Sequence, residues 1–179
     1  TYGDWSSDVC SSDLLLSVVT GLGEEAGAAM VAHPDIAKIA FTGGTDTGKL
    51  IMRNAAATLK RITLELGGKS PNIILADADL VTAAKAAVSA AFYNQGELCT
   101  SGSRLLVDRR VQDEVLDIVR EGASSLIVGH PLDKATQIGP MVSGPHKERV
   151  ESYVAKGLAE GADRIAGGTH PGPGYFVPP

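Results

Sequence analysis

The sequence predicts an α/β fold built on parallel strands, and two observations carry that prediction. Short apolar runs alternate along the chain with Ala-rich or amphipathic segments of helical period. Glycine pairs punctuate these segments, as at Gly43-Gly44 and Gly67-Gly68. Because strands that alternate with helices pair in parallel, a helical bundle and an antiparallel sandwich are both disfavoured.

The individual elements follow from these periodicities. Strands are expected where short apolar or alternating runs occur, at Leu15–Val19, Lys38–Phe41, Arg61–Leu66, Ile73–Leu75 and Arg104–Val107. Helices are expected in the segments between and after them, at Glu24–Val31, Thr45–Ala57, Leu80–Tyr93, Val111–Ile127 and Lys147–Glu160. Asp77 or Asp79 is the expected N-cap of the third helix. Loops are predicted at Asn94–Gly102 and Pro131–Pro140.

Composition narrows the classes of function. Hydrophobic residues make up 44% and charged residues 21% of the 179 residues, which is typical of a globular protein. No apolar run approaches the roughly 18 residues that span a bilayer. The net charge is -5, so neither nucleic acid nor a membrane is an expected partner. With only two cysteines, a disulfide framework is disfavoured and a reducing, cytoplasmic location is favoured.

The first residues are expected to be foreign to the fold. Residues 4–14 resemble the translation of a sequencing adapter, so residues 1–14 are predicted to be a non-native tail. This tail contains Cys10, which leaves Cys99 as the one remaining thiol. A change of domain is expected near Lys69, which divides the rest into residues 15–68 and 69–179.

Two glycine-rich turns are candidate nucleotide sites. Gly21–Ala26 fits G-x-G-x-x-G/A between a predicted strand and helix, but two adjacent glutamates would repel a pyrophosphate, and an ordinary turn fits equally well. Gly43–Lys49 nearly matches the phosphate loop G-x-x-x-x-G-K-[ST]. Leu50 replaces the hydroxyl residue that would bind Mg²⁺. A P-loop-like nucleotide-binding protein is therefore the alternative hypothesis, while the helix N-terminus still favours an anion.

Glu65 and Cys99 are the candidate catalytic residues. Glu65 lies at the carboxyl end of a predicted strand, where ligands of parallel sheets gather, although a surface glutamate on an edge strand fits too. Cys99 is flanked by small and polar residues, whereas a structural cysteine usually has apolar neighbours. His146-Lys147-Glu148 lacks the C-x-x-C of a zinc deaminase, so no metal site is predicted.

Three motifs in order resemble the aldehyde dehydrogenase superfamily: Phe41–Gly48, Leu64–Pro71 and Asn94–Arg104, with 33 residues between Glu65 and Cys99. The resemblance covers residues 15–179 and looks like the middle third of a family chain. It implies parts of a Rossmann-like NAD-binding domain over residues 15–68 and of the α/β catalytic domain over residues 69–179, truncated at both ends. It also implies an enzyme that oxidises a small aldehyde to a carboxylic acid with NAD or NADP, assembled as a homo-dimer or homo-tetramer.

The resemblance assigns roles to particular residues. Cys99 would attack the aldehyde and form a thioester, and Glu65 would be the general base. The cofactor would be bound by eight residues, with Gly43, Gly44, Thr45 and Gly48 near the pyrophosphate, Leu66 and Gly67 near the nicotinamide, and Gly23 and Gly27 near the adenine. An asparagine that helps to hold the oxyanion in the family would lie before Leu15, and a ribose-binding glutamate would lie after Pro179. The 179-residue chain alone is therefore expected to be inactive.

Overall fold

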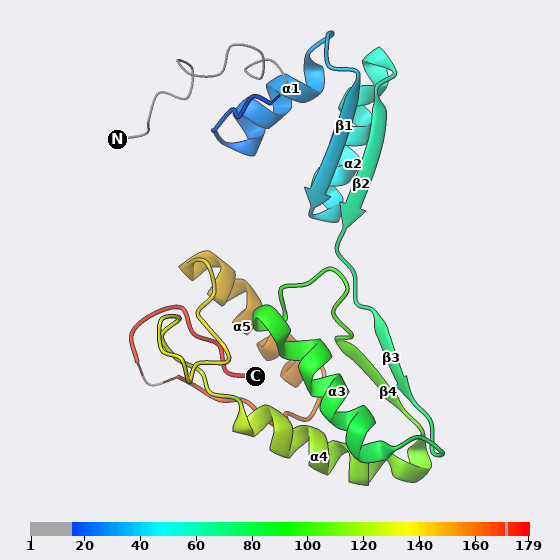
Figure 1. Ribbon diagram of the computed structural model, residues 1–179, viewed down its shortest axis with the longest axis vertical. Helices are drawn as coiled ribbons and strands as arrows, with labels where there is room; N and C mark the ends of the chain where they lie inside the picture. The colour runs from blue at the N-terminus through cyan, green and yellow to red at the C-terminus, as the bar shows by residue number, and fades with distance from the viewer. Residues whose placement is uncertain (1–15, 171) are drawn as a thin grey trace. The chain divides into compact units, whose positions relative to one another are not determined.

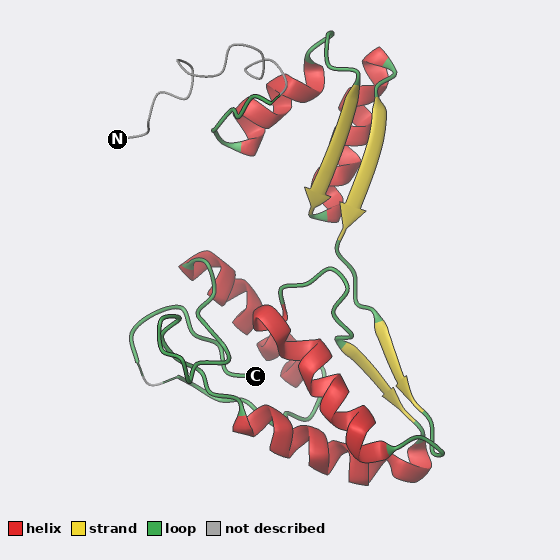
Figure 2. Ribbon diagram, viewed as in Figure 1, coloured by secondary structure: helices red, strands yellow, loops and turns green. Residues whose placement is uncertain are grey.

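The computed structural model describes residues 16–170 and 172–179, in two compact units that meet in sequence between Leu66 and Gly67. The predicted tail, residues 1–14, lies outside the described residues. Each unit has its own pair of strands with helices beside them, as Figures 1 and 2 show. The assignment of the units to a cofactor-binding and a catalytic domain stays a prediction.

The first unit contains one parallel strand pair and its crossover helix. Its elements are η1 (Gly23–Gly27), α1 (Ala28–Ala32), β1 (Lys38–Gly43), α2 (Thr45–Ala55), η2 (Ala56–Thr58) and β2 (Arg61–Leu66). The strands β1 and β2 pair in parallel from Lys38 opposite Arg61 to Gly43 opposite Leu66. The parallel pairing and the order strand, helix, strand confirm the predicted α/β class.

The prediction of a strand at Leu15–Val19 is wrong over the residues that the structure describes. Residues 16–20 have no regular secondary structure, and the side chains of Leu16 and Val18 are 79% and 81% exposed. An apolar run forms a strand only where another strand satisfies its backbone. No strand of the described residues pairs with this segment, since β1 pairs only with β2.

The core of the first unit lies between α2 and the inward face of the strand pair. Val31, Ile51 and Ala55 are buried there, and Ile39, Phe41 and Ile62 of the strands pack against them. Inward and outward residues alternate along β1 and β2, as the two-residue period of a half-buried strand requires. The outward face therefore carries the polar residues of β2, including Glu65.

Buried Lys60 directly precedes β2 and stabilises the first unit at the amino end of that strand. Its Nζ donates to the backbone oxygen of His33 and, over 2.8 Å, to that of Ile36. The side chain is only 9% exposed, so the two carbonyls satisfy an ammonium that would otherwise be costly to bury. These bonds fasten the connection from α1 to β1 against the start of β2.

The second unit also has a two-stranded parallel sheet. Its elements are β3 (Pro71–Ile74), α3 (Leu80–Phe92), η3 (Tyr93–Gly96), β4 (Arg104–Val107), η4 (Arg109–Val111), α4 (Gln112–Ser125) and α5 (Gly144–Ala159). Ile74, Ala84 and Val115, from β3, α3 and α4, form its buried core. A single bridge between Val128 and Ile138 ties the segment after α4 together.

Side-chain caps set the starts of α3 and α5 in this unit. Asp79, one of the two predicted candidates, caps α3, because its carboxylate accepts from the backbone N–H of Thr82 over 3.1 Å. The Thr82 hydroxyl also donates to it, and these bonds lower the pKa of Asp79. Ser143 caps α5, which therefore begins three residues before the predicted Lys147.

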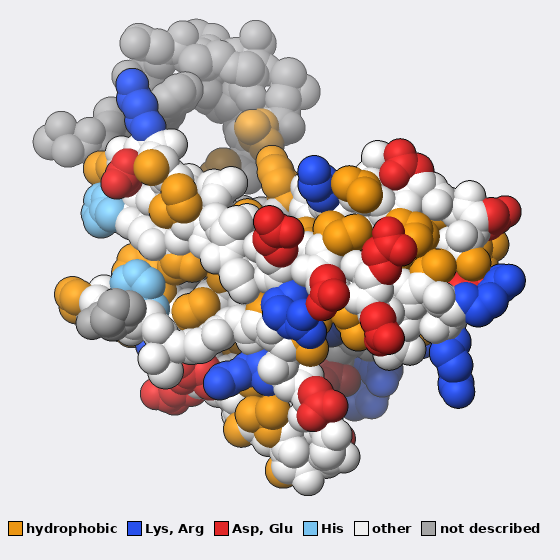
Figure 3. Space-filling view, turned by 90° about the horizontal axis from the view of Figure 1, so that it is seen from below, with side chains coloured by type: hydrophobic (Ala, Val, Ile, Leu, Met, Phe, Trp, Pro, Cys, Tyr) orange, Lys and Arg blue, Asp and Glu red, His pale blue; other side chains and the backbone are white. Residues whose placement is uncertain are grey.

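Exposed charges are paired along the helices of this unit. Lys147 and Glu151 lie 3.7 Å apart on α5, and Lys156 and the C-cap residue Glu160 lie 3.8 Å apart at the end of that helix. The face drawn in Figure 3 shows acidic and basic side chains intermixed with apolar ones. No helix among the described residues is long and apolar enough to cross a membrane.

Candidate active site

The glycine turn after β1 presents the N-terminus of α2. Gly43 ends β1, and Gly44 is the helix N-cap in an extended conformation, without a side-chain capping bond. Thr45 begins the helix. The first N–H groups of a helix have no partner inside it, and together with the helix dipole they attract an anion. A β-carbon on Gly44 would meet no atom within 4 Å, so its backbone is open to a ligand.

Gly48, one turn into α2, differs from Gly44 because it is packed against β2. It is buried, and a β-carbon there would come within 2.8 Å of one methyl group of Leu66 and 3.2 Å of the other. The missing side chain lets α2 pack closely on β2 at the strand's carboxyl end. Gly48 and Leu66, both predicted cofactor residues, therefore lie directly against each other.

Gly23 and Gly27 lie in and next to the short helix that begins the first unit. Gly23 opens η1, and Gly27 is the residue before α1 with helical backbone angles. Neither position has a neighbouring atom within 4 Å of where a β-carbon would stand. Packing therefore does not explain glycine at either place. Their proposed proximity to an adenine stays a prediction.

Glu65 lies on the outward face of β2, next to its carboxyl end. It is exposed and stands opposite Thr42 of β1, and the next pair is Leu66 opposite Gly43. Since β1 and β2 are parallel, their carboxyl ends meet at one edge. The structure thus brings Glu65, Leu66, Gly43 and the start of α2 together in the first unit. Gly67 follows as the exposed first residue of the second unit.

Cys99 lies in the second unit, in the loop from α3 to β4. It is a free, exposed cysteine. The Ser101 N–H donates to the Leu98 oxygen over 3.2 Å, which closes a turn that contains Cys99. A thiol in a polar exposed turn is accessible to a substrate, whereas a buried structural cysteine is not.

The loop begins with a left-handed turn directly after α3. Asn94 and Gln95 have φ angles of 50° and 57°, and Gly96 follows at 77°. The left-handed region costs an ordinary residue about 1 to 2 kcal/mol, so surrounding contacts must hold this turn. The Glu97 N–H donates to the Asn94 oxygen over 2.9 Å, and the Asn94 side chain donates to the Glu97 oxygen over 3.4 Å.

Glu97 faces a histidine from another helix. Its carboxylate lies 3.8 Å from Nδ1 of His146, in the first turn of α5. Both side chains are about one-third exposed, which keeps such a pair weak. The contact nevertheless links α5 to the residue two places before Cys99.

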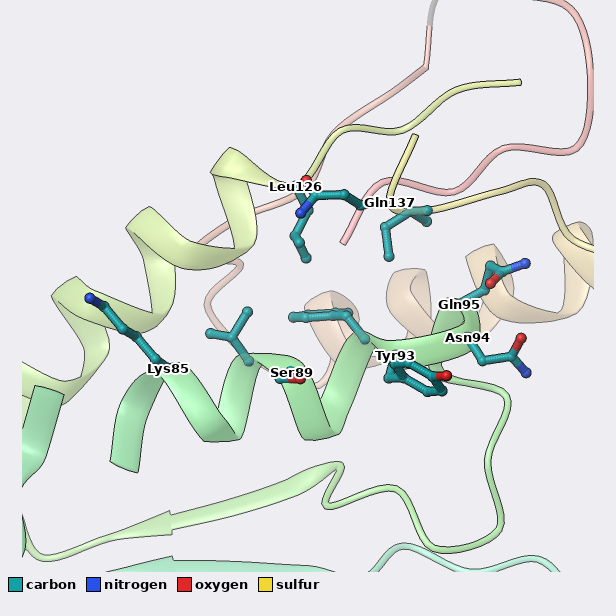
Figure 4. A pocket seen from close by; sticks show the side chains of 10 residues that line it. Lys85, Ser89, Tyr93, Asn94, Gln95, Leu126 and Gln137 are labelled. Atoms are coloured by element: carbon teal, nitrogen blue, oxygen red, sulfur yellow. The ribbon is translucent and has the colours of Figure 1, made fainter. Parts of the chain in front are cut away.

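A hollow of about 530 Å³ is lined in part by Tyr93 and by Asn94 and Gln95 of the left-handed turn, as Figure 4 shows. Val88, Phe92, Leu126 and Ile138 supply its apolar lining, and Lys85 and Gln137 line it as well. The Gln137 side chain accepts a hydrogen bond from the Ile127 N–H over 3.0 Å, which fixes that side chain. Cys99 does not line this hollow.

The predicted residues therefore fall into two groups. Glu65 belongs to the first unit with most of the cofactor residues, and Cys99 belongs to the second with Gly67. Sequence reasoning gave no role to three residues near Cys99 that the structure singles out, namely Ser101, Glu97 and the strained Gln95. Within residues 16–170 and 172–179, no group of three metal-ligating side chains gathers.

The sequence profile of the aldehyde dehydrogenase family matches residues 12–179. The putative aldehyde dehydrogenase DhaS of Bacillus subtilis (strain 168) is 49% identical over 166 residues, which are 92% of this chain and 34% of that protein. Phenylacetaldehyde dehydrogenase of Pseudomonas fluorescens is 46% identical over 166 residues, 92% of this chain and 33% of that protein. The chain belongs to the aldehyde dehydrogenase family and spans about a third of the length of these relatives.

Solved structures agree with this assignment. The NAD⁺ complex of aldehyde dehydrogenase from Bacillus cereus is 49% identical and superposes with a TM-score of 0.87 over 90% of this chain and 33% of its own. A mutant of aldehyde dehydrogenase C from Pseudomonas syringae, solved with NAD⁺ and octanal, is 39% identical with a TM-score of 0.86 over 90% of this chain and 34% of its own. These comparisons give the P-loop alternative at Gly43–Lys49 no support.

Proposed function

We propose that the complete protein containing this chain oxidises an aldehyde to a carboxylic acid with NAD or NADP, through a thioester on Cys99. The observation that carries the proposal is an exposed thiol in a polar turn, in a chain that belongs to the aldehyde dehydrogenase family. Gly43 and Gly44, two of the predicted cofactor glycines, lie at the N-terminus of α2, where an anion is favoured.

Cys99 is the nucleophile in this proposal. Its sulfur attacks the carbonyl carbon of the aldehyde, and the oxygen takes the negative charge. The backbone N–H of Cys99 is the proposed donor to that oxygen. Loss of hydride from the former aldehyde carbon restores the carbonyl and leaves an acyl group on sulfur. Covalent attachment divides oxidation and hydrolysis into two easier steps.

Glu65 is the proposed general base. It would take the proton of Cys99 before attack, or that of the water that later cleaves the thioester. Its exposed place at a strand's carboxyl end leaves the carboxylate accessible to a proton donor. Hydrolysis releases the carboxylic acid and returns the thiol to Cys99.

The residues present fit a dinucleotide. Gly44 has an open backbone, α2 has eleven residues, and Gly48 permits the close helix-to-strand packing that places the helix N-terminus. Gly43, Gly44, Thr45 and Gly48 would hold the pyrophosphate, and Leu66 and Gly67 would lie beside the nicotinamide. When bound, the cofactor supplies the acceptor for the hydride.

The substrate is proposed as a small aldehyde. Leu98 is 37% exposed beside Cys99 and favours an apolar substituent. We further propose a cytoplasmic homo-dimer or homo-tetramer for the complete protein, without a nucleic-acid or membrane partner. The 179-residue chain alone is proposed to be inactive.

Replacing Cys99 by alanine in the complete protein tests the proposal. NADH or NADPH formation with octanal or phenylacetaldehyde should fall at least about a thousandfold, because the covalent step is lost. Thr100→Ala, at the neighbouring exposed position, is the control and should keep its activity. Undiminished activity in a folded Cys99→Ala variant would overturn the mechanism.

A further inference from the structure

The hydroxyl of Ser101 joins the Cys99 turn to helix α3. Ser101 is only 6% exposed, and its Oγ donates to the Ala90 oxygen over 2.7 Å and lies 3.4 Å from the Ala91 oxygen. These carbonyls belong to the last turn of α3, where backbone oxygens have no partner inside the helix. One hydroxyl thus satisfies a helix end and fixes a residue two places after Cys99.

The hydrogen bond from the Ser101 hydroxyl holds one end of the turn that contains Cys99. Ser101 donates its N–H to Leu98, so the same residue closes the turn through its backbone and anchors it through its side chain. Cys99 and Thr100, between the two ends of the turn, are exposed. Their side chains therefore have little packing to hold them, and the position of Cys99 depends on the anchored end.

The backbone at Gly102, directly after Ser101, is tightly packed and has little room to move. A β-carbon on Gly102 would come within 3.3 Å of the Asn72 amide nitrogen and 3.4 Å of the Ala90 β-carbon. The upstream contact, between Glu97 and His146, is longer and more exposed than the bond from Ser101. The bond from the buried Ser101 hydroxyl, at 2.7 Å, is therefore shorter than the contact of Glu97 with His146 and the bond from the Asn94 side chain to the Glu97 oxygen.

We propose that Ser101 is a positioning residue for the Cys99 nucleophile, acting through its hydrogen bond to the carboxyl end of α3. The proposal rests on the proposed function, because it assumes that Cys99 is the reacting group. Ser101 itself touches no reacting atom. A loosened turn would lower the fraction of time that Cys99 spends in the reactive position, and misplacement by about 1 Å can cost about a hundredfold in rate.

Three variants of the complete protein test the inference: Ser101→Ala, which removes the hydroxyl, Ser101→Thr, which keeps it, and Ser103→Ala, an exposed serine of the same loop. For Ser101→Ala we expect kcat to fall about tenfold or more, with KM for aldehyde and cofactor within twofold. Ser103→Ala should equal the parent, and Ser101→Thr should recover most of kcat. In the 179-residue chain, the backbone amide at position 101 should exchange its hydrogen about ten times faster in Ser101→Ala than in the parent.

A kcat within twofold of the parent in a folded Ser101→Ala variant would overturn the inference. If Ser101→Ala does not fold, Ser101→Thr decides it: near-parental kcat supports the hydroxyl's role, and low kcat at unchanged thermal stability refutes it. Cys99→Ser, measured alongside, separates the two proposals. Retained turnover in Cys99→Ser would overturn the proposed function itself, whatever Ser101 does.

Discussion

Gly48→Ala would test the close packing of α2 on β2, on which the proposed cofactor site depends. Alanine inside a helix is favoured over glycine by about 1 kcal/mol. Against that gain, the new methyl group would stand 2.8 Å and 3.2 Å from the two Leu66 methyl groups. Overpacking of this kind costs about 1 to 3 kcal/mol. The net expectation is a loss of up to about 2 kcal/mol, with Leu66 displaced.

Gly27→Ala is the matched control in the same unit. It also has helical backbone angles, but its β-carbon would meet nothing within 4 Å. Only the higher helix propensity of alanine acts at that position, so Gly27→Ala should raise the free energy of unfolding by up to about 1 kcal/mol. The two variants should therefore shift in opposite directions in urea unfolding followed by circular dichroism. Equal stabilisation by both would refute the close contact between α2 and Leu66.

Two other predictions concern buried and surface charges. Lys60→Met keeps the apolar stem but removes the bonds to the His33 and Ile36 oxygens, so urea unfolding should show a loss of about 1.5 to 3 kcal/mol, while exposed Lys38→Met should change little. A loss as large in Lys38→Met would argue against the buried bonds. The Arg110 guanidinium beside Asp108 lowers the pKa of that carboxyl from 3.8 to about 2, so the pair stabilises above pH 3.8 and is lost as the pH falls toward 2. Arg110→Gln should return the pKa of Asp108 toward 3.8 in a carboxyl-carbon NMR titration, and an unmoved pKa would contradict the assigned cause.

The periodic pattern of apolar residues predicted most of the helices and strands, because polar or glycine residues mark where a periodic segment ends. Arg61–Leu66 and Arg104–Val107 are strands with the expected bounds, since alternation and flanking polar or glycine residues mark both ends. Leu15–Val19 failed because strand formation depends on a distant partner that composition does not reveal. The start of α5 was missed because Ser143 caps it before the apolar period begins.

The candidate site divides in the same way. Gly44 and the start of α2 could be predicted, because glycine and a following helix leave a local signature. The burial of Ser101 could not be predicted, because a loop has no periodic pattern that distinguishes a buried serine from an exposed one such as Ser103. The pairing of Glu97 with His146 also joins distant segments, and no local rule reports such a contact.

The proposed function depends on a thioester at Cys99, and trapping this intermediate tests it. In a Glu65→Gln variant of the complete protein, mixed with NAD and octanal, hydrolysis should slow more than acylation because the base is gone. Peptide mass spectrometry should then find an octanoyl group on the peptide that contains Cys99, and none in Glu65→Gln/Cys99→Ala. Full turnover by Glu65→Gln/Cys99→Ala, or an acyl group on another residue, would contradict the proposed covalent mechanism.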